Sequence, residues 1–385
     1  MNESNYMFSG IEKLLSAEFS YFTSLLPNVG FFGMFNNCIN LKNVFFIFLG
    51  RSKYSSYGYY SRLDYMFNNC ISLTSLTIVA DRNLSFFGSS KYMLNNCISL
   101  KSINLSDLHF YCDESSDFNN MFSNCISLET IILNYFSCGK SINMSYMFYN
   151  CSSLTSLVFS SNNVFIPEDM SYSFAYCSSL KELELNFQNT ILENLGYSFD
   201  VIAKKSMSNA FKNCTSLLTI HLNFNTNYED MSSLFMGCTS LKDINCSFIF
   251  EYSKNLNNMF YDCRALNSIE FFTKDFYKDF LKSSGFLEHN TSNLVDISKM
   301  FFGCSSLTYI DLSNFTTTNI INYEGLFYNC KKLSYINISS FTHNNLPSYN
   351  LSIFDDNYPI NTIIIINKEF SKRIKTPYNA KIIYE

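Results

Sequence analysis

Cysteine is the residue of this sequence whose type and spacing could do chemistry. The chain has 14 cysteines, and most follow one local pattern, Met-Phe-x-x-Cys or a close variant. The repeated cysteines are Cys38, Cys70, Cys97, Cys125, Cys151, Cys177, Cys214, Cys238, Cys263, Cys304 and Cys330. A regular series of thiols could ligate a metal, pair in disulfides, or fill a core as small apolar groups.

Packing is the use of these cysteines that the sequence favours. The chain has only four histidines, none of them at ligand spacing from a repeated cysteine, and it contains no Cys-x-x-Cys pair. Disulfides between neighbouring repeats are conceivable, but they would have to turn sulfurs that the periodicity points into the core. Each thiol is instead expected to be buried, with its S–H available to a backbone carbonyl. We expect no metal and no other cofactor.

The spacing of the cysteines indicates a repeat. Successive repeated cysteines are 32, 27, 28, 26, 26, 37, 24, 25, 41 and 26 residues apart. A unit of about 26 residues is typical of a leucine-rich-repeat solenoid. Degenerate copies at the two ends place Ile11 and Asn357 in the cysteine position. Asn357 could donate a hydrogen bond there as a thiol does, so the sequence predicts about 13 coils.

Each coil reads as two segments with different periods, for instance "NMSYMFYNC" followed by "SSLTSLVFS". In the first segment, Met144, Met147, Phe148 and Cys151 fall at i, i+3, i+4 and i+7, which predicts a short helix with one buried face. The second segment reproduces the pattern LxxLxL and ends in period-two alternation, which predicts a strand.

The start of the predicted helix also carries a signal. Asn143, Asp169, Asp230 and Asp296 stand just before such segments, where an N-cap residue would be. One coil is therefore a short strand, a loop and a short helix. Because one coil encloses too little volume to bury its apolar face, the coils must stack.

These patterns predict an α/β leucine-rich-repeat solenoid, with a parallel β-sheet on one face and short helices on the other. We expect a single domain over residues 1–385. Its parts are a degenerate capping coil at 1–33, eleven repeats over 34–350 with insertions near 188–206 and 272–294, and a degenerate coil with a cap at 351–385.

Three motifs resemble a known family: "MSYMFYNCSSLTSLVF", "MSSLFMGCTSLKDI" and "ISKMFFGCSSLTYIDLSNF". They are similar to the BspA-like leucine-rich repeats, particularly the MFxxCxSL variety of mycoplasma surface proteins, and the likeness spans almost the whole chain. Relatives occur on bacterial and protist surfaces and among repeat families of large insect DNA viruses, usually assigned to adhesion or host interaction. The resemblance implies a right-handed solenoid, a binding role and no catalytic residues.

Charge narrows the class of partner. The net charge of −5 and the lack of any Lys/Arg cluster argue against nucleic acid and against anionic membrane. Charged residues within 1–30 interrupt any signal-peptide core and any membrane helix, so we expect no membrane insertion. The sequence alone therefore indicates the cytoplasm, whereas the family resemblance implies the cell surface or secretion, and both alternatives stay open.

Function is expected on the strand residues that alternate with the core and face outward. The candidate protein-binding residues are Glu182, Glu184, His221, Asp243, Glu270, Tyr309, Asp311 and Tyr335. This acidic row with tyrosines could hold a basic segment of a protein partner, or it could be a solvated sheet face. No lysine or arginine occurs among the outward positions considered, which end at Asn337.

An enzyme is not expected, because the carboxylates lack a convergent pocket and a nucleophile, and no catalytic motif occurs. The insertions offer a second candidate binding region, as a recognition lip or as a flap over the core. The favoured hypothesis is a non-enzymatic protein-binding leucine-rich-repeat protein in host or cell-surface interaction or adhesion. The alternative is a structural or self-associating repeat protein without a specific external ligand. The oligomeric state stays open.

Overall fold

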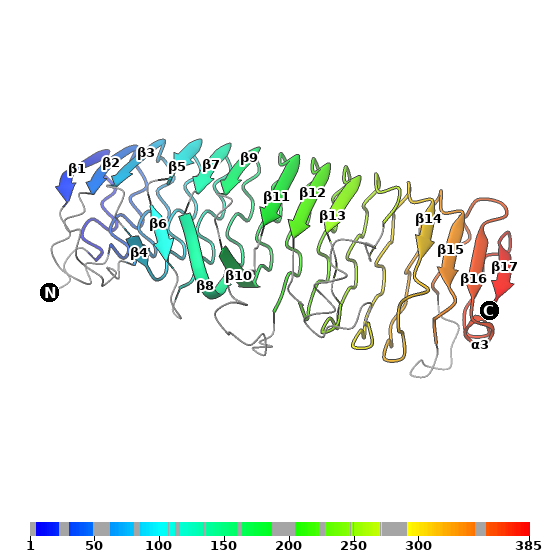
Figure 1. The fold of residues 1–385 in the computed structure, drawn as a ribbon. Coiled ribbons are helices and arrows are strands. Elements are labelled where there is room, and N and C mark those ends of the chain that lie inside the picture. Colours follow the sequence, from blue (N-terminus) through cyan, green and yellow to red (C-terminus); the bar gives the residue numbers. More distant parts are fainter. Residues whose placement is uncertain are drawn as a thin grey trace. The chain divides into compact units, whose positions relative to one another are not determined.

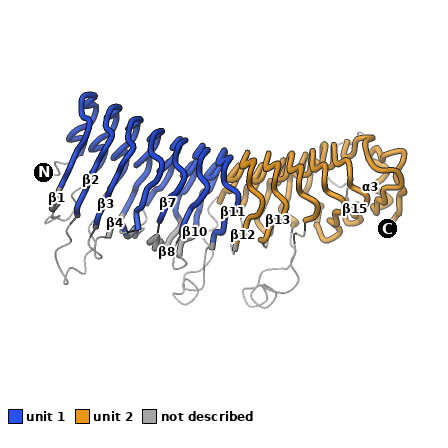
Figure 2. The backbone as a smooth tube through the Cα atoms, turned by 90° about the horizontal axis from the view of Figure 1, so that it is seen from above, with its two compact units in different colours: residues 1–202 blue, residues 203–385 orange. Residues whose placement is uncertain are grey.

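The computed structural model describes most of the chain. The described residues are 5–22, 31–48, 62–80, 85–106, 108–111, 116–133, 135–159, 164–186, 205–223, 228–246, 248, 250–269, 271, 291–342 and 352–385. The chain divides into two compact units, Met1–Ile202 and Ala203–Glu385 (Figure 2). The predicted insertions near 188–206 and 272–294 lie almost entirely outside the described residues.

Unit 1 contains the predicted parallel strands, one from each coil (Figure 1). They are β1 (Ser16–Phe22), β2 (Asn43–Phe48) and β3 (Ser75–Ala80) in one sheet, β5 (Ser102–Asn104), β7 (Thr130–Leu133) and β9 (Ser156–Phe159) in another, and β11 (Glu182–Asn186). All the pairs within the two sheets are parallel and join neighbouring coils. Aliphatic, β-branched and aromatic residues make up most of β2, β3, β7 and β9, as the strand assignment requires.

A further sheet in unit 1 was not predicted from the sequence. It has the order β10-β8-β6-β4, and all its pairs are parallel. Its strands are β4 (Ser85–Phe87), β6 (His109–Tyr111), β8 (Tyr135–Asn143) and β10 (Val164–Asp169). These segments follow the LxxLxL strand in each coil and lead into the Met-Phe-x-x-Cys segment. Their spacing varies between coils, so the repeat pattern did not reveal them.

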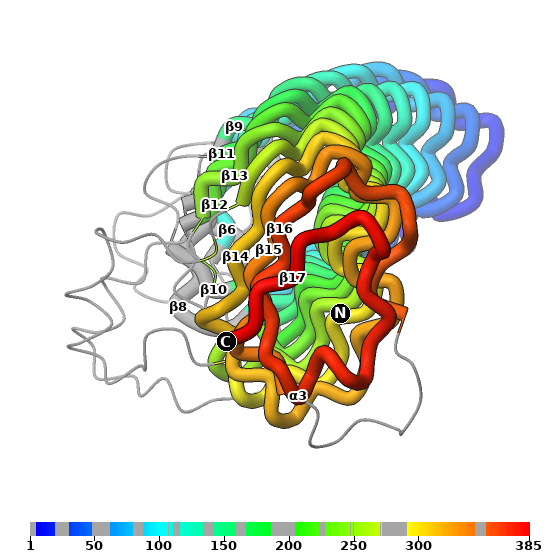
Figure 3. Tube along the Cα trace, turned by 90° about the vertical axis from the view of Figure 1, so that its right-hand side faces the viewer, coloured from blue at the N-terminus to red at the C-terminus, as the bar shows by residue number. Residues whose placement is uncertain are grey.

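Unit 2 repeats the same arrangement. Strands β12 (Thr219–Asn223) and β13 (Asp243–Cys246) pair in parallel. A four-stranded parallel sheet follows in the order β14-β15-β16-β17 (Figure 3). Its strands are β14 (Tyr309–Asp311), β15 (Tyr335–Ile338), β16 (Ile363–Ile366) and β17 (Lys381–Tyr384). Between β16 and β17 lies α3 (Lys368–Ser371), whose N-cap residue is Asn367.

The segments predicted as short helices are not helical, and α3 is the one α-helix among the described residues. Each Met-Phe-x-x-Cys segment is a run of tight turns with two residues in the left-handed region. In the coil of Cys70 these are Tyr65 at φ 58° and Asn69 at φ 60°. An α-helix cannot contain such residues, so this part of the predicted fold is corrected.

Hydrogen bonding explains the turns. The backbone N–H of Phe67 donates to the Met93 carbonyl in the next coil at 2.8 Å, whereas that of Met66 closes a local turn to Leu63 at 3.2 Å. Every second N–H therefore bonds to the neighbouring coil rather than along its own segment. Two successive turns put apolar residues three and four apart, which is the spacing that a helix also produces.

The core confirms that the repeated cysteines serve packing. All eleven are reduced thiols rather than disulfides, with at most 1% of their surface exposed. Where the contact is described, the cysteine thiol donates to a backbone carbonyl of the preceding coil. The Sγ atom of Cys151, for example, lies 3.1 Å from the carbonyl oxygen of Phe122. Burial raises the pKa of the Cys125 thiol from its ordinary 9.0 to about 12, which keeps the donor proton in place. Phenylalanine rings stack beside the thiols, for example Phe122 on Phe148 with centroids 5.4 Å apart.

The last coil corrects one assignment. Asn357 is exposed and bonds to Asp355 of its own turn. The hydroxyl of the next residue, Tyr358, donates instead to the Phe327 carbonyl, which is the kind of acceptor that the thiols use. The phenol reaches this carbonyl from the neighbouring position, whereas the Asn357 amide donates to Asp355 of its own turn. Ile11, in the first coil, is 42% exposed and does not extend the buried ladder.

The predicted capping residues do act as acceptors, although they begin turns rather than helices. Asn143, Asp169, Asp230 and Asp296 each accept a hydrogen bond from the backbone N–H two residues later, at 2.7 to 2.9 Å. A short polar side chain at this position satisfies a donor that the turn leaves unpaired.

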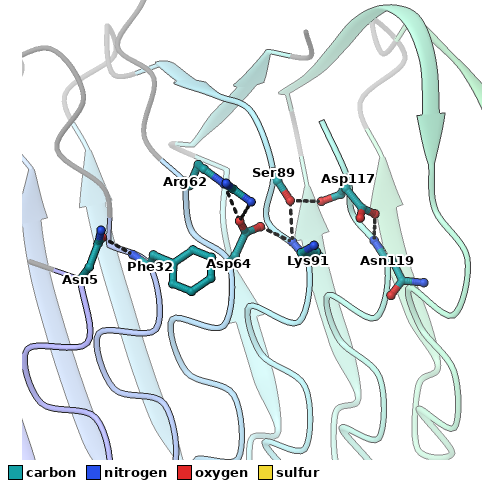
Figure 4. Close-up of polar contacts among 8 residues, drawn as sticks. All are labelled: Asn5, Phe32, Arg62, Asp64, Ser89, Lys91, Asp117 and Asn119. Atoms are coloured by element: carbon teal, nitrogen blue, oxygen red, sulfur yellow. Dashed lines mark hydrogen bonds and ion pairs between the residues drawn. The ribbon is translucent and has the colours of Figure 1, made fainter. Parts of the chain in front are cut away.

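One corner of unit 1 replaces this acceptor with an ion pair (Figure 4). Arg62 stands at the capping position, and its Nε and Nη2 lie 2.7 and 2.6 Å from Oδ2 of Asp64. The Asp64 side chain is fully buried, and its Oδ1 accepts the backbone N–H of Lys91 at 3.0 Å. The Arg62 guanidinium also lies over the Phe32 ring, 5.5 Å from its centroid.

Candidate protein-interaction surface

The strands carry the alternation on which the predicted site depends. On β5, Ser102 and Asn104 are exposed on either side of the buried Ile103. On β14, Tyr309 and Asp311 are exposed on either side of Ile310. Because successive side chains of a strand point to opposite faces, every second residue stands on an outward sheet face.

Two predicted residues lie in unit 1. Glu182 and Glu184 are exposed on β11 and flank Leu183, which is 4% exposed. The two carboxylates therefore share the outward face of one strand.

Two more lie on neighbouring strands of unit 2. His221 on β12 and Asp243 on β13 are both exposed, and in register they stand opposite Asn245 and Thr219 respectively. The Nδ1 atom of His221 lies 3.1 Å from the amide nitrogen of Asn245. The contact described for the imidazole is thus to a neutral amide, not to a carboxylate or a nucleophile.

Three predicted residues meet on β14 and β15. Tyr309 and Tyr335 are in register, and their rings stack with centroids 4.7 Å apart and planes 11° from parallel. The Tyr309 hydroxyl lies 3.4 Å from Oδ2 of Asp311, and the Asn337 amide donates to the same oxygen at 3.3 Å. We call Tyr309, Asp311, Tyr335 and Asn337 the Tyr–Asp cluster.

Asp311 is held by a further donor. The backbone N–H of Ser313 donates to its Oδ1 at 2.9 Å. The carboxylate is therefore oriented by three groups while it stays exposed at the sheet surface. An oriented acceptor loses little conformational entropy when it binds a cationic group.

Seven of the eight predicted residues are described. They fall into the β11 pair, the β12–β13 pair and the Tyr–Asp cluster, whereas Glu270 lies outside the described residues. In the Tyr–Asp cluster four side chains contact one another directly, so it is the strongest candidate surface.

The candidate set left out residues that extend the same face. Asn337 completes the Tyr–Asp cluster, and the isoleucines of β16 and Lys381 on β17 continue the outward rows in register. The run "IIII" could have indicated this part of the surface. A strand with one solvated face alternates apolar and polar residues, and four consecutive isoleucines depart from that alternation.

The part of the chain that the structure describes contains neither a candidate metal site nor a candidate membrane-spanning helix. No group of three or more His, Cys, Asp or Glu side chains there could hold a metal ion. None of the described helices is long and apolar enough to cross a membrane.

Comparison with protein families identifies the chain. The model of the family described as "Mycoplasma protein of unknown function, DUF285" matches residues 61–187, 182–273 and 271–364. The chain belongs to this family. The match confirms the resemblance to BspA-like repeats, and together with the coil geometry it confirms the leucine-rich-repeat solenoid.

Solved structures similar to this DUF285 chain include leucine-rich repeat proteins of bacteria. One from Bacteroides ovatus is 15% identical, with 98% of this chain and 86% of the other covered and a TM-score of 0.41. The pneumococcal vaccine antigen PcpA is 14% identical, with 96% and 84% covered and a TM-score of 0.32. A leucine-rich repeat protein of Leptospira interrogans is 12% identical, with 93% and 82% covered and a TM-score of 0.27. Comparison with curated proteins gives no match.

Proposed function

We propose that this DUF285 chain is a non-enzymatic protein-binding solenoid whose Tyr–Asp cluster holds a basic segment of a partner protein. The role would be adhesion or host interaction at a cell surface or after secretion, as the likeness to BspA-like repeats implies. The observation that carries the proposal is the oriented, exposed carboxylate of Asp311 beside the stacked rings of Tyr309 and Tyr335.

The chemistry of the cluster suits a cationic side chain. A carboxylate binds lysine or arginine through charge-assisted hydrogen bonds, and a tyrosine ring attracts the same cation through its face or packs against its aliphatic stem. Tyrosine is also enriched among residues that dominate binding energy at interfaces. The described surface offers no paired base and nucleophile, which supports binding rather than catalysis.

The test uses peptides selected by display on the immobilised wild-type chain. We expect enrichment of peptides containing lysine or arginine, and we expect Asp311→Lys to weaken their binding about tenfold or more, because it replaces attraction by repulsion. Glu324→Lys is the matched control, since Glu324 is also an exposed acid of unit 2 but lies outside the strands. Peptides without basic residues, or equal weakening by both variants, would contradict the proposal.

Self-association is a second candidate function, and the exposed apolar residues near the last strands favour it. Ile360 is 82% exposed, Tyr378 is 84% exposed and Tyr384 is 57% exposed. Burial of large apolar side chains of this kind against a second copy of the chain would stabilise a dimer. Sedimentation velocity over a wide concentration range tests this, and a monomer throughout would exclude it.

A further inference from the structure

Strand β16 has an unusual sequence for a strand with one solvated face. All four residues of Ile363–Ile366 are isoleucine, and Ile364 and Ile366 are fully buried in the core. Ile363 and Ile365 point to the opposite, outward face and are only partly covered. Parallel strands with continuous apolar runs are those covered on both faces. The sequence of β16 is therefore that of a strand whose outer face is also covered.

The neighbouring strand continues the apolar surface. Ile383 of β17 is in register with Ile365, and 38% of its surface is exposed. Ile363 is in register with Tyr335, whose ring belongs to the Tyr–Asp cluster. We call Ile363, Ile365 and Ile383 the isoleucine patch; it occupies both outward rows of β16 and one row of β17.

Opposite charges flank the isoleucine patch. Asp311 lies on β14, at one side, and Lys381 lies on β17, at the other, and both are exposed. Three strand spacings and one step of two residues separate them, which amounts to about 16 Å between the two positions on the sheet. The surface thus has a negative end, a middle formed by Tyr335, Asn337 and the isoleucine patch, and a positive end.

We propose that the isoleucine patch binds an amphipathic helix of a partner protein, with a basic residue against Asp311 and an acidic residue against Lys381. The inference rests on the proposed protein-binding function and specifies the partner. A helix matches because the isoleucine patch is two rows wide on β16, whereas an extended segment presents its side chains to a single row. At a rise of 1.5 Å per residue, the two charges of the helix stand about ten residues apart.

A designed peptide supplies the probe. It is a fluorescent alanine-based helix with leucines at its fifth, sixth and ninth positions, a lysine at its second and a glutamate at its twelfth. Two further peptides carry two lysines or two glutamates at the charged positions. Fluorescence anisotropy should show the mixed-charge peptide binding the wild-type chain about threefold more tightly than either of the others, because each of the others exchanges one exposed ion pair for a like-charge contact.

Variants of the chain separate the apolar and the charged contributions. Ile365→Lys should abolish binding of the mixed-charge peptide, and Ile321→Lys should retain it, because Ile321 is 52% exposed outside the strands. Lys381→Glu should move the preference to the two-lysine peptide, a change of order that a misfolded chain could not produce. Buried thiols that stay unreactive show that each variant is folded.

Three results would overturn the inference: no binding of any peptide, binding unaffected by Ile365→Lys, or the same peptide order with Lys381→Glu. These results leave the proposed function standing if display still selects basic peptides that depend on Asp311. If display also fails to select them, the inference and the proposed function are both wrong.

Discussion

At the residue scale, the repeated cysteine is a structural donor. Its thiol is small enough for the core and gives its proton to a carbonyl of the preceding coil, as Cys263 does to Phe235 at 3.1 Å. Burial is the largest cause that raises the pKa values of the Cys125 and Cys263 thiols. A thiol that stays protonated is a poor nucleophile and a poor metal ligand, which agrees with packing as its role.

Alkaline pH should therefore destabilise the fold. The pKa of the Cys125 thiol is about 12 in the folded chain against an ordinary 9.0, so unfolded thiols release protons at a pH where folded thiols keep them. The contribution of such a protonated thiol to the free energy of unfolding is fully present below pH 9. It declines by about 1.4 kcal/mol per pH unit as the pH rises toward the pKa of the folded chain. Urea unfolding between pH 8 and pH 11 measures this, and a constant midpoint would contradict it.

The ion pair of Arg62 and Asp64 gives a second prediction at this scale. Arg62→Gln should lower the free energy of unfolding by about 1–3 kcal/mol, because it leaves the buried Asp64 carboxylate without its cation. The loss should lie toward the lower value, since the Arg62 side chain is 56% exposed and water screens the pair.

The double variant Arg62→Gln with Asp64→Asn is the control for that ion pair. It removes both charges, so thermal unfolding should recover most of the loss. A double variant that is less stable than Arg62→Gln alone would show that the pair does not act through charge.

At the scale of the element, the turn segment replaces the predicted helix because its donors serve two coils. Left-handed residues at two positions of each turn segment redirect alternate N–H groups to the neighbouring coil. Asparagine suits these positions, since it tolerates the left-handed region better than most residues. Its amides also form ladders between coils, such as Asn69 to Asn37 at 2.9 Å and Asn68 to Asn36 at 2.8 Å.

Asn69→Val should therefore destabilise unit 1 more than Asn68→Val. Both substitutions remove comparable ladder hydrogen bonds, but only Asn69 has a positive φ, of 60°. A β-branched residue in the left-handed region adds about 1–2 kcal/mol of strain. Urea unfolding of the two variants measures the difference, and equal losses would show that the conformation carries no cost.

At the scale of the whole molecule, stability is a sum over neighbouring coils. The phenylalanine column of unit 2 illustrates this, because each ring stacks on the ring of the next coil. In such solenoids an interior coil has two packed neighbours, whereas an outer one has fewer.

Phe301→Ala should consequently cost more than Phe354→Ala. Phe301 stacks between Phe260 and Phe327, at 5.7 and 5.8 Å, whereas Phe354 stacks on Phe327 at 5.6 Å. We expect a loss of about 3–5 kcal/mol for Phe301→Ala, because it leaves a cavity between two coils, and a smaller loss for Phe354→Ala. Denaturant unfolding compares them, and a larger loss for Phe354→Ala would contradict nearest-neighbour stability.

The amino-acid sequence by itself determined the repeat, the strands, the buried thiols and the outward residues, because periodicity within one coil encodes which side chains meet the core. Only the tertiary structure decided the turns, the further sheet of unit 1, the place of Tyr358 and the Tyr–Asp cluster. Each of these depends on contacts between coils more than 20 residues apart, as Asp311 and Asn337 are. Local periodicity cannot distinguish a helix from two turns when half of the donors bond to a neighbour, nor can it fix which side chains meet across strands.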